Sequence, residues 1–191
     1  MATVATPMTT AELLALPDDG TERWLIAGEL RERPREQRMT VRNRFHSRIL
    51  ICTGTELEIW NRQQPPPRGQ VLGGEAGVRL SANPDTTVGI DIVYVSAEVL
   101  VRQTEETTLI AGVPILAVEI LSPSDTVEDI DERVDAFLAA GVALVWIIDP
   151  RDRTVTVYRP GAEPELFNVR QELCGEPHLP GFRVPVARLF E

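Results

Sequence analysis

Two short apolar runs, Ile115 to Leu121 and Val142 to Ile148, enclose a segment in which apolar side chains recur every three or four residues. Runs of this length that are rich in β-branched residues are typical of buried strands, whereas the spacing between them is that of a helix. Asp125 and Glu128 match a capping box at the start of this helix, and Gly141 ends it. The pattern therefore predicts strand, helix and strand, with a crossover long enough for the two strands to be parallel.

The remainder of the chain is predicted to form shorter elements on both sides of this unit. Helical spacing predicts further helices, and alternation of apolar and polar residues predicts further strands, some of them paired in hairpins. Helices are expected at residues 10–16, 40–61 and within 97–108, and strands at 24–26, 29–31, 69–72, 77–80, 89–96, 153–158, 164–168 and 179–185. The chain, 1–191, is predicted to be one domain of α/β structure, with a frayed N-terminus at 1–9.

The helix expected at residues 40–61 has one apolar stripe. Its members are Val41, Phe45, Ile49, Cys52, Ile59 and Trp60. Such a stripe is the face through which a helix packs on its neighbours. The positions that fall off this stripe are Arg42, Arg44, His46 and Arg48.

Two acidic residues interrupt strands that otherwise look buried. Glu119 stands in the first apolar run, and Asp91 stands in the strand GIDIVYVS at residues 89–96. An unpaired buried carboxylate is costly, so each must be paired, protonated or bound to a metal. One interpretation is a Glu119 that is satisfied by an arginine or by backbone donors. The other is a pair of carboxylates from two strands that holds a hard divalent cation such as Mg²⁺.

Four segments of the chain resemble the Uma2 (DUF820) family. They are GEL at 28–30, the Asp of GIDIVYVS, AVEILSPS at 117–124 and GVALVWIIDP at 141–150. The resemblance extends over residues 10–190. It implies a nuclease with the restriction-endonuclease-like, PD-(D/E)XK fold, which has a mixed central β-sheet flanked by helices and here additional β-hairpins.

The resemblance also implies an active site. Asp91 and Glu119 would bind Mg²⁺ or Mn²⁺, and Glu29, the acid of GEL, would be an auxiliary ligand. The other interpretation of Glu29 is an exposed residue of the hairpin. The lysine that the PD-(D/E)XK motif places two residues after the Glu is replaced by Leu121. In the family the basic residue is found more often in the following helix, which implies Arg133 as the third catalytic residue.

Arg133 has two interpretations. It could stabilise charge on a phosphate, or it could form an i, i+4 ion pair with Asp129 on its own helix. All 19 of the chain's lysine-or-arginine positions are arginine, so the chain contains no lysine. A guanidinium can bind a phosphate through two bonds but cannot accept a proton, so the metal or Glu119 would have to deprotonate the attacking water.

Charge is distributed unevenly along the chain. The formal net charge is −10, yet residues 31–48 contain seven arginines and two glutamates, a local net of +5. This stretch is either a solvated surface or a basic surface for a nucleic-acid backbone. Arg42, Arg44 and Arg48 are the expected substrate-binding residues. Ser124 is expected either to orient a phosphate at a helix N-terminus or to cap that helix.

The location of the protein is inferred from targeting and membrane-spanning patterns, which we do not find in the sequence. It has no signal-peptide pattern and no apolar run long enough to span a bilayer, and its two cysteines, Cys52 and Cys174, do not suggest a disulfide framework. A cytoplasmic protein without membrane contact is expected.

We predict a homodimeric endonuclease that hydrolyses DNA, which is favoured over RNA. The first alternative is a nuclease-fold protein that has lost catalysis and acts as a nucleic-acid-binding or assembly module. The second is a hydrolase of smaller phosphoesters.

Overall fold

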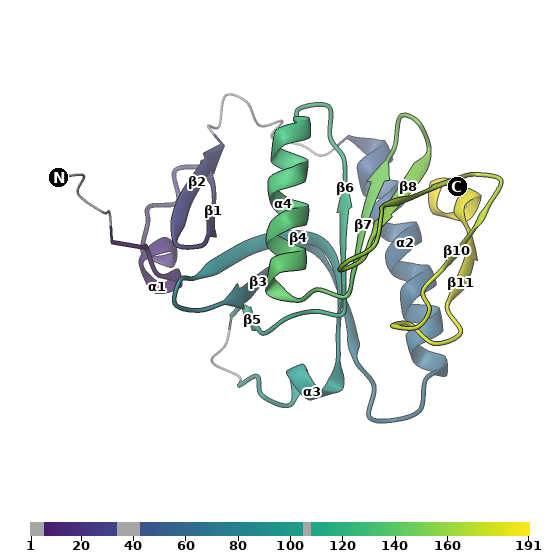
Figure 1. Ribbon diagram of the computed structural model, residues 1–191, viewed down its shortest axis with the longest axis horizontal. Helices are drawn as coiled ribbons and strands as arrows, with labels where there is room; N and C mark the ends of the chain where they lie inside the picture. The colour runs from purple at the N-terminus through teal and green to yellow at the C-terminus, as the bar shows by residue number, and fades with distance from the viewer. Residues whose placement is uncertain (1–5, 34–42, 105–107) are drawn as a thin grey trace.

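A large mixed sheet with one long helix on each face forms the core of the computed structural model, which describes residues 6–33, 43–104 and 108–191 (Figure 1). The predicted α/β architecture is confirmed. The elements are α1 (Thr10–Leu14), β1 (Glu22–Ile26), β2 (Glu29–Arg33), α2 (Arg44–Gln63), β3 (Gln70–Ser81), β4 (Thr86–Val95), α3 (Ala97–Leu100), β5 (Ile110–Ala111), β6 (Leu116–Ile120), α4 (Val127–Ala140), β7 (Leu144–Asp149), β8 (Thr154–Tyr158), β9 (Glu165–Asn168), β10 (Glu172–Cys174), β11 (Arg183–Pro185) and the 3-10 helix η2 (Val186–Phe190).

The nine-stranded sheet has the order β2-β1-β4-β6-β7-β8-β9, and β3, with β5 beside it, pairs with β4 outside this path. β6 and β7 are parallel, as predicted from the crossover through α4, while β4 pairs with β6 in antiparallel fashion. The hairpins β1–β2 and β8–β9 were also predicted and are confirmed. The long, bent β4 joins the N-terminal hairpin to the central strands.

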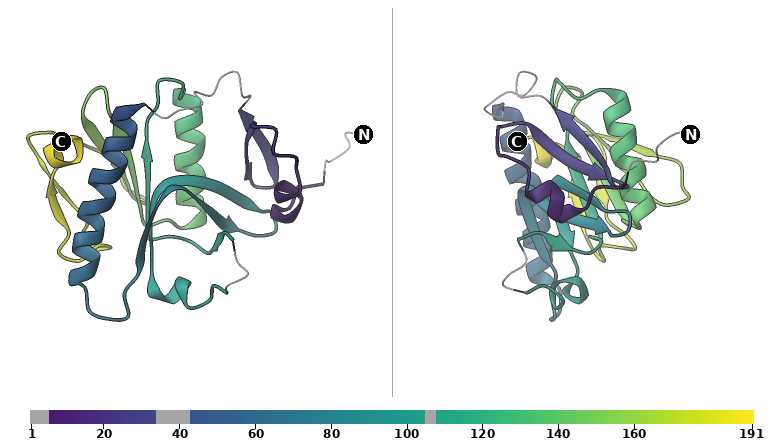
Figure 2. Two further views of the ribbon diagram at one scale, coloured as in Figure 1. Left: turned by 180° about the vertical axis from the view of Figure 1, so that it is seen from behind. Right: turned by 90° about the vertical axis from the view of Figure 1, so that its left-hand side faces the viewer.

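The two long helices lie on opposite faces of the sheet (Figure 2). Alternate residues of β6 supply the two faces, since Leu116, Val118 and Ile120 belong to the apolar cluster under α2, whereas Ala117 belongs to the cluster under α4. Side chains two apart on a strand share a face, so Glu119 lies on the α4 side with Ala117. The face expected for Glu119 therefore matches the packing.

The predicted packing face of α2 is wrong in part. Phe45 and Ile59 are exposed, while His46 and Asn61 are buried. The buried polar groups find partners: Asn61 Nδ2 donates to the Gly69 carbonyl at 3.0 Å, and His46 contacts an acid of β4. Because their polar atoms are hydrogen-bonded, His46 and Asn61 can face the sheet, while the apolar Phe45 and Ile59 face solvent. The spacing of apolar residues in the sequence does not reveal such polar contacts.

Two local predictions also differ from the structure. α4 is capped by Thr126, whose hydroxyl accepts from Asp129 N at 3.1 Å, and not by Asp125. Asp125 instead accepts a hydrogen bond from the Ser122 amide at 2.7 Å, so it terminates the preceding turn. The strands expected at 69–72 and 77–80 form one strand, β3, which continues through a bulge.

The N-terminal segment is fixed from Met8 onward. The Met8 amide donates to Gly28 at 2.8 Å, and Thr9 caps α1. The fraying expected at residues 1–9 therefore does not include these two positions, and residues 1–5 lie outside the described part. In the described ranges, no helix has both the length and the apolar character that crossing a membrane requires.

Candidate active site

A break in the strand pairing of β4 creates the site. On one edge β4 pairs with β1 through Thr87 and with β6 from Ile92 to Tyr94. Extension of the β4–β6 register by one residue beyond Ile92 and Val118 places Asp91 opposite Glu119. The two predicted acids therefore meet where β1 and β6 diverge, and the structure brings them together.

Asp91 is buried and held by two contacts to one oxygen. Its Oδ2 accepts a hydrogen bond from the Ile120 amide at 2.8 Å and lies 3.2 Å from His46 Nε2. The Asp91 carboxylate thus accepts the β6 backbone hydrogen bond that a neighbouring strand would otherwise accept. His46 contacts the same carboxylate from α2. With only 5% of Asp91 exposed, its carboxylate has little freedom to turn.

Glu119 is buried against an arginine but only half satisfied. Its Oε2 lies 2.8 Å from Arg133 Nη1, whereas its Oε1 is buried and has no hydrogen-bond partner among the described residues. The pKa of Glu119 is raised to about 8, chiefly by burial. The positive charge of Arg133 acts to lower this pKa, and the negative charge of Asp91 acts to raise it. The same ion pair raises the pKa of Arg133.

Arg133 pairs with Glu119 of β6 and not with Asp129 of its own helix. Its guanidinium pairs with Glu119 and lies over the ring of Trp24, 5.6 Å from the centroid. Asp129, the expected i, i+4 partner, instead lies 3.6 Å from Arg33. The arginine is thus aimed at the sheet, although it is half-buried at the border of α4.

A small pocket of about 40 Å³ surrounds these groups. Five acids and two arginines line it, namely Glu22, Glu75, Asp91, Glu119, Asp125, Arg33 and Arg133, together with Gly89, Ile120 and Ser122. Arg33 lies 3.2 Å from Asp125 and 3.8 Å from Glu22. The lining is therefore strongly polar, with an excess of negative charge.

Sequence reasoning did not assign four of the charged lining residues to the site: Asp125, which was expected only as a helix cap, and Glu22, Arg33 and Glu75. Glu22 and Arg33 come from the hairpin β1–β2, and their place in the pocket depends on how that hairpin packs beside β4. Glu75 follows Gly73 and Gly74, and consecutive glycines inside a strand pattern are a signal for a bulge. For the hairpin residues no local signal exists.

Glu29 does not join the pocket. Its side chain is 71% exposed and pairs with Arg31 at 2.9 Å. Arg31 in turn binds Glu132 of α4 at 2.7 Å, so this pair fixes the hairpin against the helix. The hairpin contributes Glu22 to the pocket in place of the expected Glu29.

The expected substrate-binding residues lie on the surface. Arg44 is exposed and stacks on Phe45 with 4.6 Å between guanidinium and ring centroid, and exposed Arg48 donates to the Glu191 carbonyl. Ser124 is exposed, with its hydroxyl 3.0 Å from that of Ser122. Arg42 lies outside the described residues.

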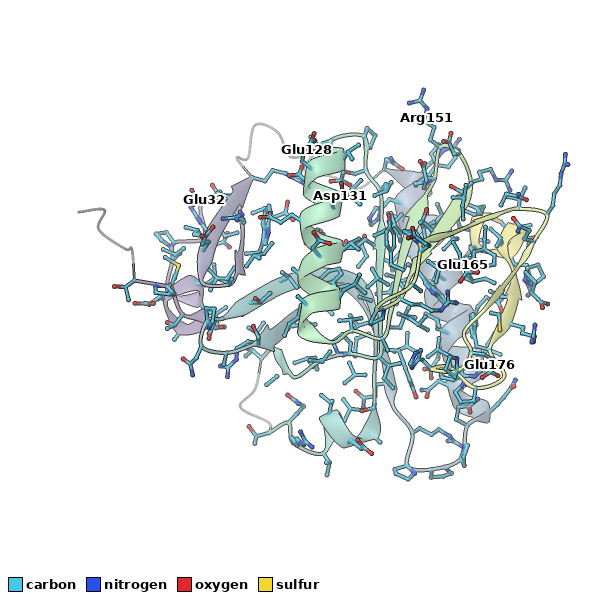
Figure 3. The ribbon with its side chains drawn as sticks, in the orientation of Figure 1. Glu32, Glu128, Asp131, Arg151, Glu165 and Glu176 are labelled. Atoms are coloured by element: carbon cyan, nitrogen blue, oxygen red, sulfur yellow. The ribbon has the colours of Figure 1, made fainter. Side chains whose placement is uncertain are left out.

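Acidic side chains are exposed on α4, the helix that also carries Arg133 of the pocket. Figure 3 shows Glu128 and Asp131 on α4, and Figure 2 shows α4 and α2 on opposite faces of the sheet. Both acids are exposed. The electrostatic field of the molecule therefore differs between its two helical faces.

The residues present fit a hard divalent cation. Mg²⁺ is held by one or two carboxylates and keeps several waters, and Asp91 and Glu119 supply two carboxylates. Among the described residues, the buried Oε1 of Glu119 has no hydrogen-bond partner, so a cation could bind it. Across the described ranges, no three acidic, histidine or cysteine side chains are gathered closely enough to hold an ion by themselves. A cation bound here would rely on water for the remaining positions.

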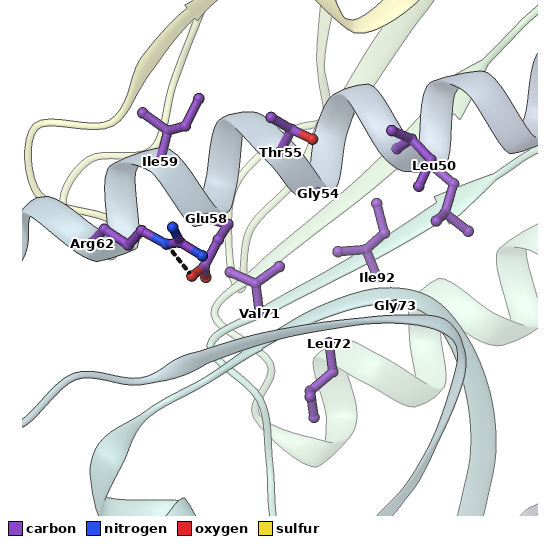
Figure 4. A pocket seen from close by; sticks show the side chains of 11 residues that line it. Leu50, Gly54, Thr55, Glu58, Ile59, Arg62, Val71, Leu72, Gly73 and Ile92 are labelled. Atoms are coloured by element: carbon purple, nitrogen blue, oxygen red, sulfur yellow. Dashed lines mark hydrogen bonds and ion pairs between the residues drawn. The ribbon is translucent and has the colours of Figure 1, made fainter.

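A wider hollow of about 440 Å³ lies between α2 and β3 (Figure 4). It is mostly apolar, and the two charged residues in its lining, Glu58 and Arg62, neutralise each other at 2.8 Å. It lacks converging titratable groups, so the smaller polar pocket is the better candidate for chemistry.

Comparison with known proteins identifies the family and the fold of the chain. The family model Uma2, described as "Putative restriction endonuclease", matches residues 11–187. The structure described as "a putative nuclease belonging to DUF820 from Anabaena variabilis ATCC 29413" has the same fold, with a TM-score of 0.76 and 22% identity over 96% of this chain and 98% of that one. None of the curated proteins matches the chain.

Proposed function

The chain belongs to the Uma2 family of restriction-endonuclease-like proteins, and from this premise we propose that it is a metal-dependent endonuclease that hydrolyses DNA phosphodiester bonds. One observation supports the proposal above all others. Asp91 and Glu119 line the same pocket from neighbouring strands, and one buried oxygen of Glu119 has no hydrogen-bond partner in the part of the chain that the structure describes. A buried carboxylate in that state is expected to have a ligand in the working protein.

Asp91 and Glu119 would hold the ion, Mg²⁺ or Mn²⁺. When bound, such an ion lowers the pKa of water and stabilises negative charge on a phosphate. His46 and the Ile120 amide keep the Asp91 carboxylate in one orientation. The chain's own contribution at this point is a fixed pair of acidic ligands.

Arg133 stabilises charge on the substrate. Its guanidinium holds Glu119 in the absence of substrate, and it can exchange that carboxylate for a phosphate oxygen because it lies at the half-buried rim of the pocket. It cannot accept the proton of the attacking water, since a guanidinium remains protonated at physiological pH. A pocket carboxylate or the bulk solvent must therefore take that proton.

DNA would approach along the N-terminal end of α2. Arg44 and Arg48 are exposed on α2, the helix that carries His46, whose ring contacts Asp91. The exposed acids of α4, Glu128 and Asp131, would repel a polyphosphate from the outer surface of that helix. Homodimerisation would let two such sites cut both strands, and we place this activity in the cytoplasm.

Plasmid nicking tests the proposal. The purified protein with Mg²⁺ or Mn²⁺ should convert supercoiled plasmid to the open-circular form, and Asp91→Ala should abolish the conversion. Glu98→Gln removes an exposed acid outside the pocket lining and serves as the control. Equal nicking by Asp91→Ala would refute the proposed site.

A second candidate function is that of a nucleic-acid-binding module without catalysis. The ion pair between Arg133 and Glu119 favours it, because that arginine already neutralises one oxygen of the proposed ligand. Calorimetric titration with Mg²⁺ separates the two functions. Binding that disappears in Glu119→Gln supports the enzyme, whereas no binding by the wild type supports the module.

A further inference from the structure

The bulge of β3 brings an acidic residue to the pocket with an unfavourable backbone conformation. The β3–β4 register shifts between Gly73 and Ala76, and the residues between them, Gly74 and Glu75, have φ of 87° and 61°. Glycine adopts positive φ readily, but a residue with a long side chain rarely does. Strained residues at bulges are common beside active sites, where the bulge redirects a side chain.

Glu75 points to the same face of β4 as Asp91. A Cβ placed on Gly89 would lie 3.7 Å from the Cβ of Glu75. Gly89 and Asp91 are two residues apart on one strand, so they share a face and are separated by about 7 Å. Glu75 lines the pocket, and its Oε1 is shielded from solvent. Its carboxylate thus shares the pocket with the carboxylates of Asp91 and Glu119.

We propose that Glu75 is a positioning residue of the active site, whose carboxylate holds a water molecule beside the cation bound by Asp91 and Glu119. This inference rests on the proposed function. Two protein carboxylates leave most positions around Mg²⁺ or Mn²⁺ to water, and no third ligand is gathered with them among the described residues. A carboxylate beyond the ligands orients those waters by accepting their hydrogen bonds.

The placement of Glu75, and not merely its charge, distinguishes this role. Glu22 lines the same pocket but lies on a regular strand, 3.8 Å from Arg33. Replacement of Glu22 by glutamine removes the same charge from the same pocket without touching the bulge. It is therefore the matched control for Glu75.

Calorimetric titration of the full chain with MnCl₂ tests the proposal. Glu75→Gln should weaken Mn²⁺ binding about tenfold or more, as is typical when a group behind the ligands is lost. The exposed control Glu98→Gln should bind as the wild type does, Glu22→Gln should lose clearly less affinity than Glu75→Gln, and Asp91→Asn should abolish binding. Wild-type affinity in Glu75→Gln, or an equal loss in Glu22→Gln, would overturn the role of Glu75 while leaving the proposed function intact. Absence of Mn²⁺ binding by the wild type would overturn the proposed function, and the role of Glu75 with it.

Thermal unfolding without metal gives a second, independent readout. Glycine adopts the backbone of residue 75 without strain, so Glu75→Gly should raise the melting temperature by about 2–4 °C while weakening Mn²⁺ binding. A glutamate kept for stability would behave in the opposite way. A lowered melting temperature in Glu75→Gly would therefore contradict the proposal.

Discussion

Replacement of Glu119 by glutamine should make the protein more stable than the wild type at alkaline pH. Burial raises the pKa of Glu119 to about 8 in the folded protein, whereas the ordinary value is 4.5. The folded state therefore binds this proton more tightly than the unfolded state does. Its contribution to the free energy of unfolding is complete below pH 4.5 and is lost as the pH rises toward 8. Glutamine is neutral and has nearly the same shape, so it does not titrate.

The size of the effect follows from the shift in pKa. Each unit corresponds to about 1.4 kcal/mol, so the wild type should lose about 3–4 kcal/mol between pH 5 and pH 8 from this group alone. Urea unfolding followed by circular dichroism at pH 5, 6, 7 and 8 measures the difference between wild type and Glu119→Gln. The control Glu98→Gln, an exposed acid, should keep the pH profile of the wild type.

The reasoning would be refuted if the free energies of unfolding of the wild type and Glu119→Gln differed by the same amount at pH 5, 6, 7 and 8. That result would mean that Arg133 keeps Glu119 ionised at every pH, despite the buried oxygen that lacks a partner among the described residues. Glu119 would then be a satisfied structural ion pair.

Three further substitutions test other parts of the structure. His46→Ala should weaken Mn²⁺ binding about tenfold in calorimetry, because Asp91 loses a contact that fixes its orientation, and His46→Asn should restore part of the loss. Thr10→Val should lower the free energy of unfolding, measured in urea, by about 1–3 kcal/mol, because buried Asp85 loses the hydroxyl that donates to it. The control Thr9→Val, at the exposed cap of α1, should lower the free energy of unfolding by no more than about 1 kcal/mol. Gly141→Ala should cost about 1 kcal/mol in the same assay, because α4 ends there with a φ of 96°.

The central unit could be predicted from the sequence because its signals are local. Two apolar runs, a helical spacing between them and Gly141 define β6, α4 and β7 without reference to the rest of the chain. The two acids within buried strands are conspicuous for the same reason. Their proximity was only one of two interpretations of the sequence, and it is the β4–β6 register of the structure that places Asp91 opposite Glu119.

The remaining parts of the site depend on contacts between distant segments. His46 is buried because it reaches Asp91, and Arg33 lines the pocket because the N-terminal hairpin packs beside β4. The conformation of Glu75 arises from a register shift between two strands. Hydrophobic spacing contains no information about such polar contacts, which explains why α2 was assigned a partly wrong face.

Anomalous diffraction from crystals soaked in MnCl₂ tests the central claim most directly. The account predicts one strong peak within bonding distance of both Asp91 and Glu119, with the guanidinium of Arg133 displaced from the Glu119 oxygen that it now contacts. Crystals that show no peak there, with the Arg133–Glu119 ion pair intact, would contradict it.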